Sequence, residues 1–364
     1  IAHYLEHKMF DQPDGSNVFD KFSKYGANAN AFTSFNMTAY LFSATSNIEE
    51  NLETLLDYVQ SPYFTDESVQ KEQGIIGQEI GMYDDNGGWR VFFNFLDCLY
   101  NYHPVKKDIA GTVESISHIT AEYLYKCYNT FYNLSNMSIV VVGNIDPQKI
   151  LSVIENGIKK NEPFTEEIKK VYPEEPAHIS KSYKEQSLSV AMPLFMTGFK
   201  DTDTGYDGKK LLKKYIELTI LLKMIFGKSS RLYNNLYEQG LITPSFNAEY
   251  TMQPDYGYTA IEGESSDPKK VYELMLNEIK RLQNDGLNEK DFNRIKKVVW
   301  GEYIKTLNDV ENYGVAFMQM LFQGIDYFDY YDVYKTVTFE DIVNRFNQHF
   351  TAENAALSVV NPIG

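Results

Sequence analysis

Two histidines and a glutamate stand within the first seven residues of the chain, in the stretch IAHYLEHKMF. If this stretch is helical, His3 and His7 lie one turn apart on one face, with Glu6 beside them. Two imidazoles in this arrangement can bind one zinc ion, and zinc makes water nucleophilic at neutral pH. A neighbouring carboxylate can take the proton that the water loses. The spacing H-x-x-E-H therefore predicts a hydrolytic zinc site.

A zinc site of this kind needs a third protein ligand, which leaves the fourth position open for water. The candidates are Glu72 and Glu79, which lie seven residues apart in KEQGIIGQEIGMYDDNGGWRVFF. Seven residues are two helical turns, so both carboxylates share one helix face. One of them can bind the metal while the other orients the site or relays protons.

The alternative is that H-x-x-E-H marks a solvated helix face that carries two histidines by chance. In a chain with six histidines, chance produces the pattern on the order of a per cent of the time. The apolar residues Ile1, Ala2 and Leu5 make the stretch half-buried, and unpaired histidine and glutamate would be costly there. These observations favour the metal site.

Composition limits the classes of partner and the compartment. The chain has 34 Lys and Arg against 50 Asp and Glu, a formal net charge of −16, which disfavours nucleic acid and anionic membrane surfaces. No apolar run is long enough to predict a membrane span. Cys98 and Cys127 are the only cysteines, so we expect a reducing compartment, the bacterial cytoplasm. We expect the natural N-terminus to be absent, so a signal peptide stays open.

A duplicated unit organises the chain. The stretch ITAEYLYKCYNTFYNLSNMSIVVVGNI, from Ile119, aligns without a gap with VTFEDIVNRFNQHFTAENAALSVVNPI, from Val337. Each copy predicts a threonine-capped helix, a turn and a β-branched strand. Further upstream, residues 65–80 parallel residues 287–302, and AHYLEHKMF parallels ELTILLKMIF.

The two copies differ where the chemistry would be. The second copy replaces the two histidines and the glutamate by Leu218, Leu221 and Leu222. This pattern indicates one half that carries a polar site and one half in which the same helix is plain core.

The fold class predicted from this pattern is α+β, with two homologous domains. Each would be a mainly antiparallel sheet covered by helices on one face, with strands in AYLFSAT (from Ala39) and LSVAMPLF (from Leu188). We expect a zinc-bearing half at 1–162, a linker rich in proline and charge at 163–183, and a degenerate half at 184–364.

The motifs resemble a known family of zinc metallopeptidases. H-x-x-E-H is the inverted zinc motif of the pitrilysin and insulin-degrading family, which includes mitochondrial processing peptidase. AHYLEHKMF is similar to the first active-site helix of that family, NANAFTSFNMTAYLF to the following strand, and ESVQKEQGIIGQEIGMYDDN to the ligand helix. HPVKKDIAGTVESISHIT resembles the next segment, so the likeness covers the first half. It is greatest to small bacterial members with two homologous domains per chain.

The resemblance implies a role for each polar residue. His3, His7 and Glu79 would bind one Zn²⁺ per chain. Glu6 would be the general base, and Glu72 a second catalytic glutamate that supports the ligands. In the family, strands of the first sheet precede the motif, so we expect those strands to be missing from the half at 1–162.

The resemblance also implies substrate contacts. An extended peptide would add as a further strand to an edge strand at Asn30, Ala31 and Phe32. The residues that match aromatic positions of a substrate pocket are Phe10, Trp89 and Phe92. For these three aromatic residues, the pocket and the hydrophobic core are about equally expected.

The second half departs from the pattern of active members, which use an Arg and a Tyr to bind the substrate and its oxyanion. Here Tyr237 stands at the Arg position and Thr243 at the Tyr position. We therefore expect a peptidase that works as a homo- or heterodimer with a homologous chain that supplies the Arg and Tyr. The alternative is a non-catalytic scaffold or a peptide-binding homologue.

Overall fold

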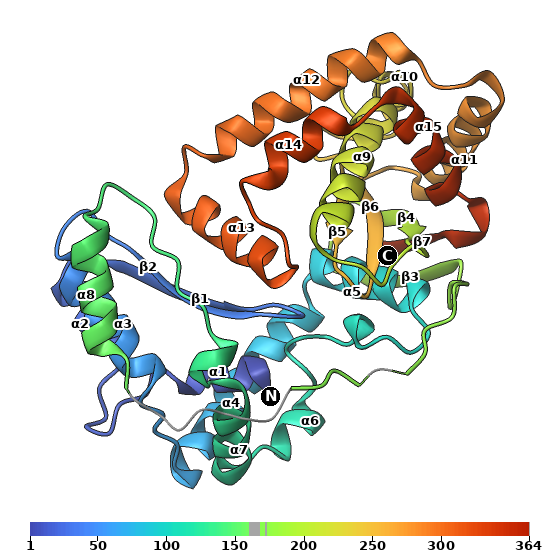
Figure 1. The fold of residues 1–364 in the computed structure, drawn as a ribbon. Helices are drawn as coiled ribbons and strands as arrows, with labels where there is room; N and C mark the ends of the chain where they lie inside the picture. The colour runs from blue at the N-terminus through green and yellow to red at the C-terminus, as the bar shows by residue number, and fades with distance from the viewer. Residues whose placement is uncertain (160–167, 172, 364) are drawn as a thin grey trace. The chain divides into compact units, whose positions relative to one another are not determined.

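The computed structural model describes residues 1–159, 168–171 and 173–363 (Figure 1). Contacts divide the chain into two compact units. The first unit is Ile1–Met82 with Asp108–Val171, and the second is Tyr83–Lys107 with Tyr172–Gly364. Helices and two antiparallel-rich sheets confirm the predicted α+β class. Part of the predicted linker 163–183, namely 163–167 and 172, lies outside the described residues.

The first unit is built on an antiparallel β-hairpin. Strand β1 (Asn28–Thr33) pairs with β2 (Thr38–Ser43) in a register that runs from Asn28 opposite Ser43 to Thr33 opposite Thr38. The helices of this unit are α1 (Ala2–Lys8), α2 (Val18–Lys24), α3 (Ile48–Val59), α4 (Asp66–Asp84, its last two residues in the second unit), α6 (Val113–Ser117), α7 (Ala121–Phe131) and α8 (Pro147–Gly157), with a short 3₁₀ turn η2 (Leu134–Asn136).

One face of the hairpin forms the core beside α1. Ala29 and Ala31 of β1, with Tyr40 and Phe42 of β2, pack on a cluster of buried side chains from α2, α3 and the turn after α1. That cluster consists of Phe10, Val18, Phe22, Tyr58 and Val59. Since side chains alternate along a strand, Asn30 and Phe32 are directed to the opposite face.

The second unit contains a five-stranded sheet in the order β3-β7-β4-β6-β5, antiparallel except for the parallel pair β3 and β7. Its strands are β3 (Tyr183–Leu188), β4 (Leu194–Lys200), β5 (Asn247–Met252), β6 (Gly257–Glu264) and β7 (Ala355–Pro362). Its helices are α5 (Gly87–Leu99), α9 (Gly208–Phe226), α10 (Arg231–Glu238), α11 (Pro268–Asp285), α12 (Glu289–Thr306), α13 (Val310–Phe322), α14 (Asp329–Thr336) and α15 (Phe339–His349), with 3₁₀ turns η1 (Pro104–Lys106) and η3 (Ala352–Asn354).

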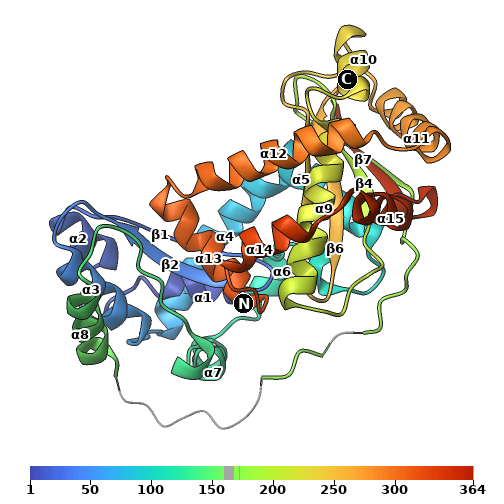
Figure 2. The same cartoon turned by 45° about the horizontal axis from the view of Figure 1, so that its top comes forward.

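Helix α9 lies along this sheet, as Figures 1 and 2 show. Its leucines and isoleucines join Phe195, Phe199 and Leu357 in the main hydrophobic core. Helix α5 packs against β3, β4 and β7. There, Gly87 lies so close to Leu194 that a Cβ on Gly87 would come within 2.8 Å of the leucine side chain. The part of the chain that the structure describes has no helix long and apolar enough to cross a membrane.

The predicted duplication is visible in the capped helices. Thr120 and Thr338 cap α7 and α15 by accepting a hydrogen bond from the backbone three residues on, and each helix leads into a 3₁₀ turn. Strand β7 then forms in the second copy, but residues 137–142 form no strand in the first, so that prediction is wrong. A strand needs neighbours: β7 bonds to β3 and β4, whereas the described residues of the first unit offer 137–142 no such pair.

The strand predicted over LSVAMPLF is also corrected. Strand β3 ends at Leu188 and β4 begins at Leu194, with a turn between them that contains Pro193. Proline has no N–H to donate to a sheet, so it stands outside the ladder. A proline-containing part of the predicted linker is held in place: the Glu175 carboxylate accepts hydrogen bonds from the Lys200 ammonium and from three backbone N–H groups at 101–103.

Candidate functional site

Helix α1 is held against α4 by two side chains. The Tyr4 hydroxyl donates a hydrogen bond to the carbonyl of Val69 at 2.5 Å, and the Lys8 ammonium donates to the carbonyl of Ser68 at 3.3 Å. Tyr4 and Lys8 are each 1% exposed, and Lys8 also pairs with Asp11. These buried contacts fix the two helices that carry the predicted ligands.

The structure brings His3, His7 and Glu79 together. Their potential ligand atoms all lie within 4.8 Å of one another. His7 Nε2 is 3.3 Å from Glu79 Oε2, and His3 Nε2 is 3.6 Å from Glu79 Oε1. A tetrahedral zinc ion with bonds of about 2.0–2.1 Å places its ligand atoms about 3.4 Å apart. The two distances between the histidines and Glu79 are therefore close to the spacing of zinc ligands.

The protonation chemistry of the site also suits a cation. Burial lowers the pKa of His3 against the opposing effect of Glu79, so the imidazole is neutral and has a lone pair to offer. His3 Nδ1 is buried and has no hydrogen-bond partner among the described residues. With the carboxylates of Glu6, Glu72 and Glu79 nearby, a divalent cation would offset the negative charge that collects around the two imidazoles.

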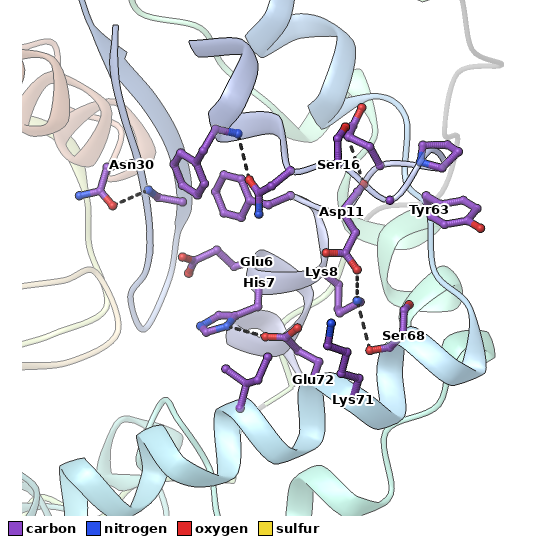
Figure 3. Close-up of a pocket in the computed structure, with 18 residues that line it drawn as sticks. Glu6, His7, Lys8, Asp11, Ser16, Asn30, Tyr63, Ser68, Lys71 and Glu72 are labelled. Atoms are coloured by element: carbon purple, nitrogen blue, oxygen red, sulfur yellow. Dashed lines mark hydrogen bonds and ion pairs between the residues drawn. The ribbon is translucent and has the colours of Figure 1, made fainter. Parts of the chain in front are cut away.

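Glu72 fixes the orientation of His7. The two meet at 3.1 Å between His7 Nδ1 and Glu72 Oε1, as Figure 3 shows. This hydrogen bond is the main cause that raises the pKa of His7. Burial is the largest single effect on the pKa of Glu72 and raises it, but the His7 bond together with the charges of His7, Lys8 and Lys71 lowers the pKa overall. Because Nδ1 takes part in this bond, Nε2 is left for a metal. A carboxylate that orients a metal-binding histidine in this way is common at metal sites.

Glu6 leaves α1 in a different direction, toward β1, while His7 is directed to Glu72 (Figure 3). Glu6 is 7% exposed, and its Oε2 accepts a hydrogen bond from the Thr33 hydroxyl at 2.5 Å. Burial raises the pKa of Glu6 and the Thr33 bond opposes that shift. A carboxylate with a raised pKa is a stronger base near neutral pH.

Thr33 was not predicted from the sequence as a site residue. It lies at the end of β1, on the same face as Ala31, because side chains two apart share a face. In the sequence, the only indication of its role was that Thr33 directly follows Phe32, the last of the predicted substrate-binding residues.

A cavity of about 620 Å³ opens beside Glu6, His7 and Glu72. Of the predicted substrate residues, Phe10, Asn30 and Ala31 line it, and Phe32 does not. Asn30 is exposed and accepts a hydrogen bond from the Ala31 N–H. Phe10 is 8% exposed and its ring stacks on Phe19 at 4.4 Å, so it is mostly core with one surface on the cavity.

Trp89 and Phe92 lie on α5, in the second unit. There Trp89 stacks on Tyr83 at 4.2 Å between ring centroids, and Phe92 packs edge-on against Phe93 at 5.2 Å. Their role in a substrate pocket stays a prediction.

The two residues at the expected Arg and Tyr positions carry no cation. Tyr237 is 51% exposed on α10 and stacks on Tyr233. The Thr243 hydroxyl is 2.7 Å from the Ser245 hydroxyl and 3.2 Å from a carboxylate oxygen of Glu264. Neither can replace the forked guanidinium donor of an arginine.

Comparisons with known proteins agree with the motif. Residues 1–113 match the family profile described as Insulinase (Peptidase family M16), and residues 118–299 match the Peptidase M16 inactive domain. The uncharacterized zinc protease YmfH of Bacillus subtilis is 44% identical over 366 residues, an alignment that covers 100% of this chain and 84% of YmfH. The chain belongs to peptidase family M16. This confirms the resemblance stated from H-x-x-E-H.

Two solved structures are similar over all or nearly all of the chain. An M16-like protein from Alicyclobacillus acidocaldarius, whose structure is solved, is 37% identical in sequence, with a TM-score of 0.95. The alignment covers 100% of this chain and 86% of that protein. A protease from Helicobacter pylori has the same fold, with a TM-score of 0.84 at 19% identity, over 99% of this chain and 88% of that one.

Proposed function

We propose that this chain is a zinc-dependent endopeptidase subunit that hydrolyses extended peptides, with Glu6 as general base. The observation that carries the proposal is the approach of His3, His7 and Glu79 to within 4.8 Å, with Glu6 beside them. Membership of a family whose named relatives are zinc proteases supports it.

In this proposal His3, His7 and Glu79 hold one Zn²⁺, and Glu72 keeps the ring of His7 in place through Nδ1. Zinc, when bound, would make water nucleophilic toward a peptide carbonyl. Glu6 takes the proton that this water loses and delivers it to the leaving amine. The buried setting of Glu6 keeps bulk water from competing for that proton.

The peptide would bind along β1 at Asn30, Ala31 and Phe32, because a strand edge binds an extended backbone with little regard to its sequence. Among the described residues, β1 pairs only with β2, which leaves its second edge for such a peptide. Phe10 borders the cavity and would contact a substrate side chain, and we assign Trp89 and Phe92 to the same task.

We further propose that a homologous chain supplies the missing Arg and Tyr. Tyr237 and Thr243 offer no cation to the substrate, so the isolated chain would be weakly active. The cytoplasm is the compartment that we propose, since Cys98 and Cys127 are both free thiols.

The test is Glu6→Gln, assayed with a mixture of unstructured peptides in the presence of a homologous chain that carries Arg and Tyr. We expect turnover to fall by about 10²- to 10⁴-fold, the range for loss of a general base, while zinc content stays that of the wild type. Unchanged turnover in Glu6→Gln would refute the proposed role.

A second candidate is a peptide-binding homologue that does not cut. The residues at the Arg and Tyr positions favour it, because Tyr237 and Thr243 cannot supply the family's oxyanion contacts. The Glu6→Gln variant separates the two, since a binder would retain peptide affinity and show no turnover in either form.

A further inference from the structure

Two hydroxyl groups lie in series behind Glu6. Thr33 donates to Glu6 Oε2, and its Oγ1 is 3.3 Å from the Oγ1 of Thr38, which faces it across the hairpin. All of these residues belong to the first unit.

Counting protons gives the direction of every bond in this series. A hydroxyl has one proton to donate, and an ionised carboxylate can only accept. Thr33 uses its proton on Glu6, so it must accept from Thr38. Both O–H groups point toward the carboxylate, an arrangement in which each bond strengthens the next.

We propose that Thr38 and Thr33 form a positioning chain for Glu6. The chain holds Oε2 in place and leaves Oε1 as the oxygen that takes the proton from water. Thr33 is also the last residue of β1, the strand proposed to bind the peptide. Substrate binding and the position of the base are thereby coupled through one residue. The catalytic part of this inference rests on the proposed function.

The second unit supports the assignment, because it lacks the carboxylate and the hydroxyl groups together. Met252 ends β5 and Gly257 begins β6, opposite each other, in the same way that Thr33 and Thr38 face each other between β1 and β2. The counterparts of Glu6, Thr33 and Thr38 in the duplicated half are Leu221, Met252 and Gly257. Where no base needs to be held, both hydroxyls are replaced by groups that cannot donate.

The test compares Thr33→Val, which keeps the shape of the side chain, with Thr33→Ser, which keeps the hydroxyl. Thr54→Val on α3 is the matched control, because the Thr54 hydroxyl only donates to a backbone carbonyl of its own helix. Infrared difference spectra of each protein against its Glu6→Gln form isolate the Glu6 carboxylate band. This readout requires neither peptide nor partner chain.

We expect the band to shift in Thr33→Val and to keep its wild-type position in Thr33→Ser and Thr54→Val. In the peptide assay, kcat should fall about 10- to 100-fold in Thr33→Val, as expected for a hydrogen bond to a charged group, with KM and zinc content unchanged. Thr33→Ser should restore kcat to within about threefold of wild type, because the charge-assisted bond is retained.

Two results would overturn the chain: an unshifted band in Thr33→Val, or a Thr33→Ser variant as impaired as Thr33→Val. A shifted band in a protein that shows no peptidase activity even with a partner would support the hydrogen-bond chain and refute the proposed function instead. The two failures are therefore distinguishable.

Discussion

Helices α1 and α9 occupy the same place in the duplicated halves and differ in what they carry. In α9, Leu218 and Leu221 are fully buried in the main core of the second unit. In α1, the matching positions are His3 and Glu6, and each polar group there has a partner on another element, Glu79 or Thr33. The same helix position in this fold can thus carry an apolar core side chain or a polar side chain of the candidate site. A buried polar side chain is tolerated where neighbouring groups form hydrogen bonds or ion pairs with it.

The largest effect on stability is expected when a charged group is placed at the matching helix position of the second half. In Leu221→Glu, a carboxylate enters a core with no donor prepared for it, which should lower the free energy of unfolding by about 4 kcal/mol or more. Urea denaturation measures the change. Leu221→Met, similar in volume, should cost less than about 1.5 kcal/mol. If the two variants are equally stable, the second unit is more tolerant of charge than this account holds.

The second unit has a buried histidine of its own, His349, with a different role. Burial lowers its pKa to about 4, and its ring lies 3.2 Å from the Thr259 hydroxyl. Between pH 6.5 and 4 the unfolded chain binds a proton that the folded chain does not, so stability falls as pH falls. A shift of this size corresponds to about 3 kcal/mol over that window.

His349→Gln should remove that part of the pH dependence of unfolding, whatever its stability at pH 7. Urea denaturation at several pH values between 7 and 4.5 provides the measurement, with the exposed His178→Gln as control. Equal slopes for His349→Gln and wild type would show that the ring titrates normally in the folded state.

The partner of His7 offers a smaller change. Glu72→Gln removes the charge that holds Nδ1, and zinc affinity should fall about 10- to 100-fold, the usual effect of losing a group that orients a ligand. Competition with a chromophoric chelator measures the affinity. Glu67→Gln, an exposed change in the first turn of α4, is the matched control. Equal affinity in both variants would mean that Glu72 does not support His7.

The smallest effect is expected at Tyr237, which stands where active members of the family carry arginine. Its side chain is 51% exposed, so Tyr237→Ala should change the free energy of unfolding by about 0.5 kcal/mol or less. Thermal denaturation and zinc analysis of the variant check this. A substantial loss of peptide turnover in the presence of the partner would instead give Tyr237 a function that the account denies it.

Features that depend on local spacing were predictable from the sequence. The grouping of His3, Glu6 and His7 and the threonine caps of α7 and α15 follow from a few neighbouring residues. The approach of Glu72 and Glu79 to α1 needed the family resemblance, because 65 residues separate His7 from Glu72.

Features that depend on distant neighbours were not predictable. Residues 137–142 contain more β-branched side chains than their counterpart in β7, yet no paired strands flank them in the described first unit. The Thr33 hydroxyl reaches Glu6 across 27 residues of sequence, and no local pattern announces that contact. Helix α5 follows α4 directly in sequence but packs on strands that come some hundred residues or more later, because its apolar face matches that sheet.

Elemental analysis shows directly whether His3, His7 and Glu79 bind zinc. Wild-type protein and His7→Ala would be purified without chelators and compared for zinc per chain, with circular dichroism to verify that both are folded. We expect about one zinc per wild-type chain, as for a single three-ligand site, and loss of that zinc in the variant. Folded wild-type protein that holds no zinc and takes up none when it is supplied would contradict this expectation.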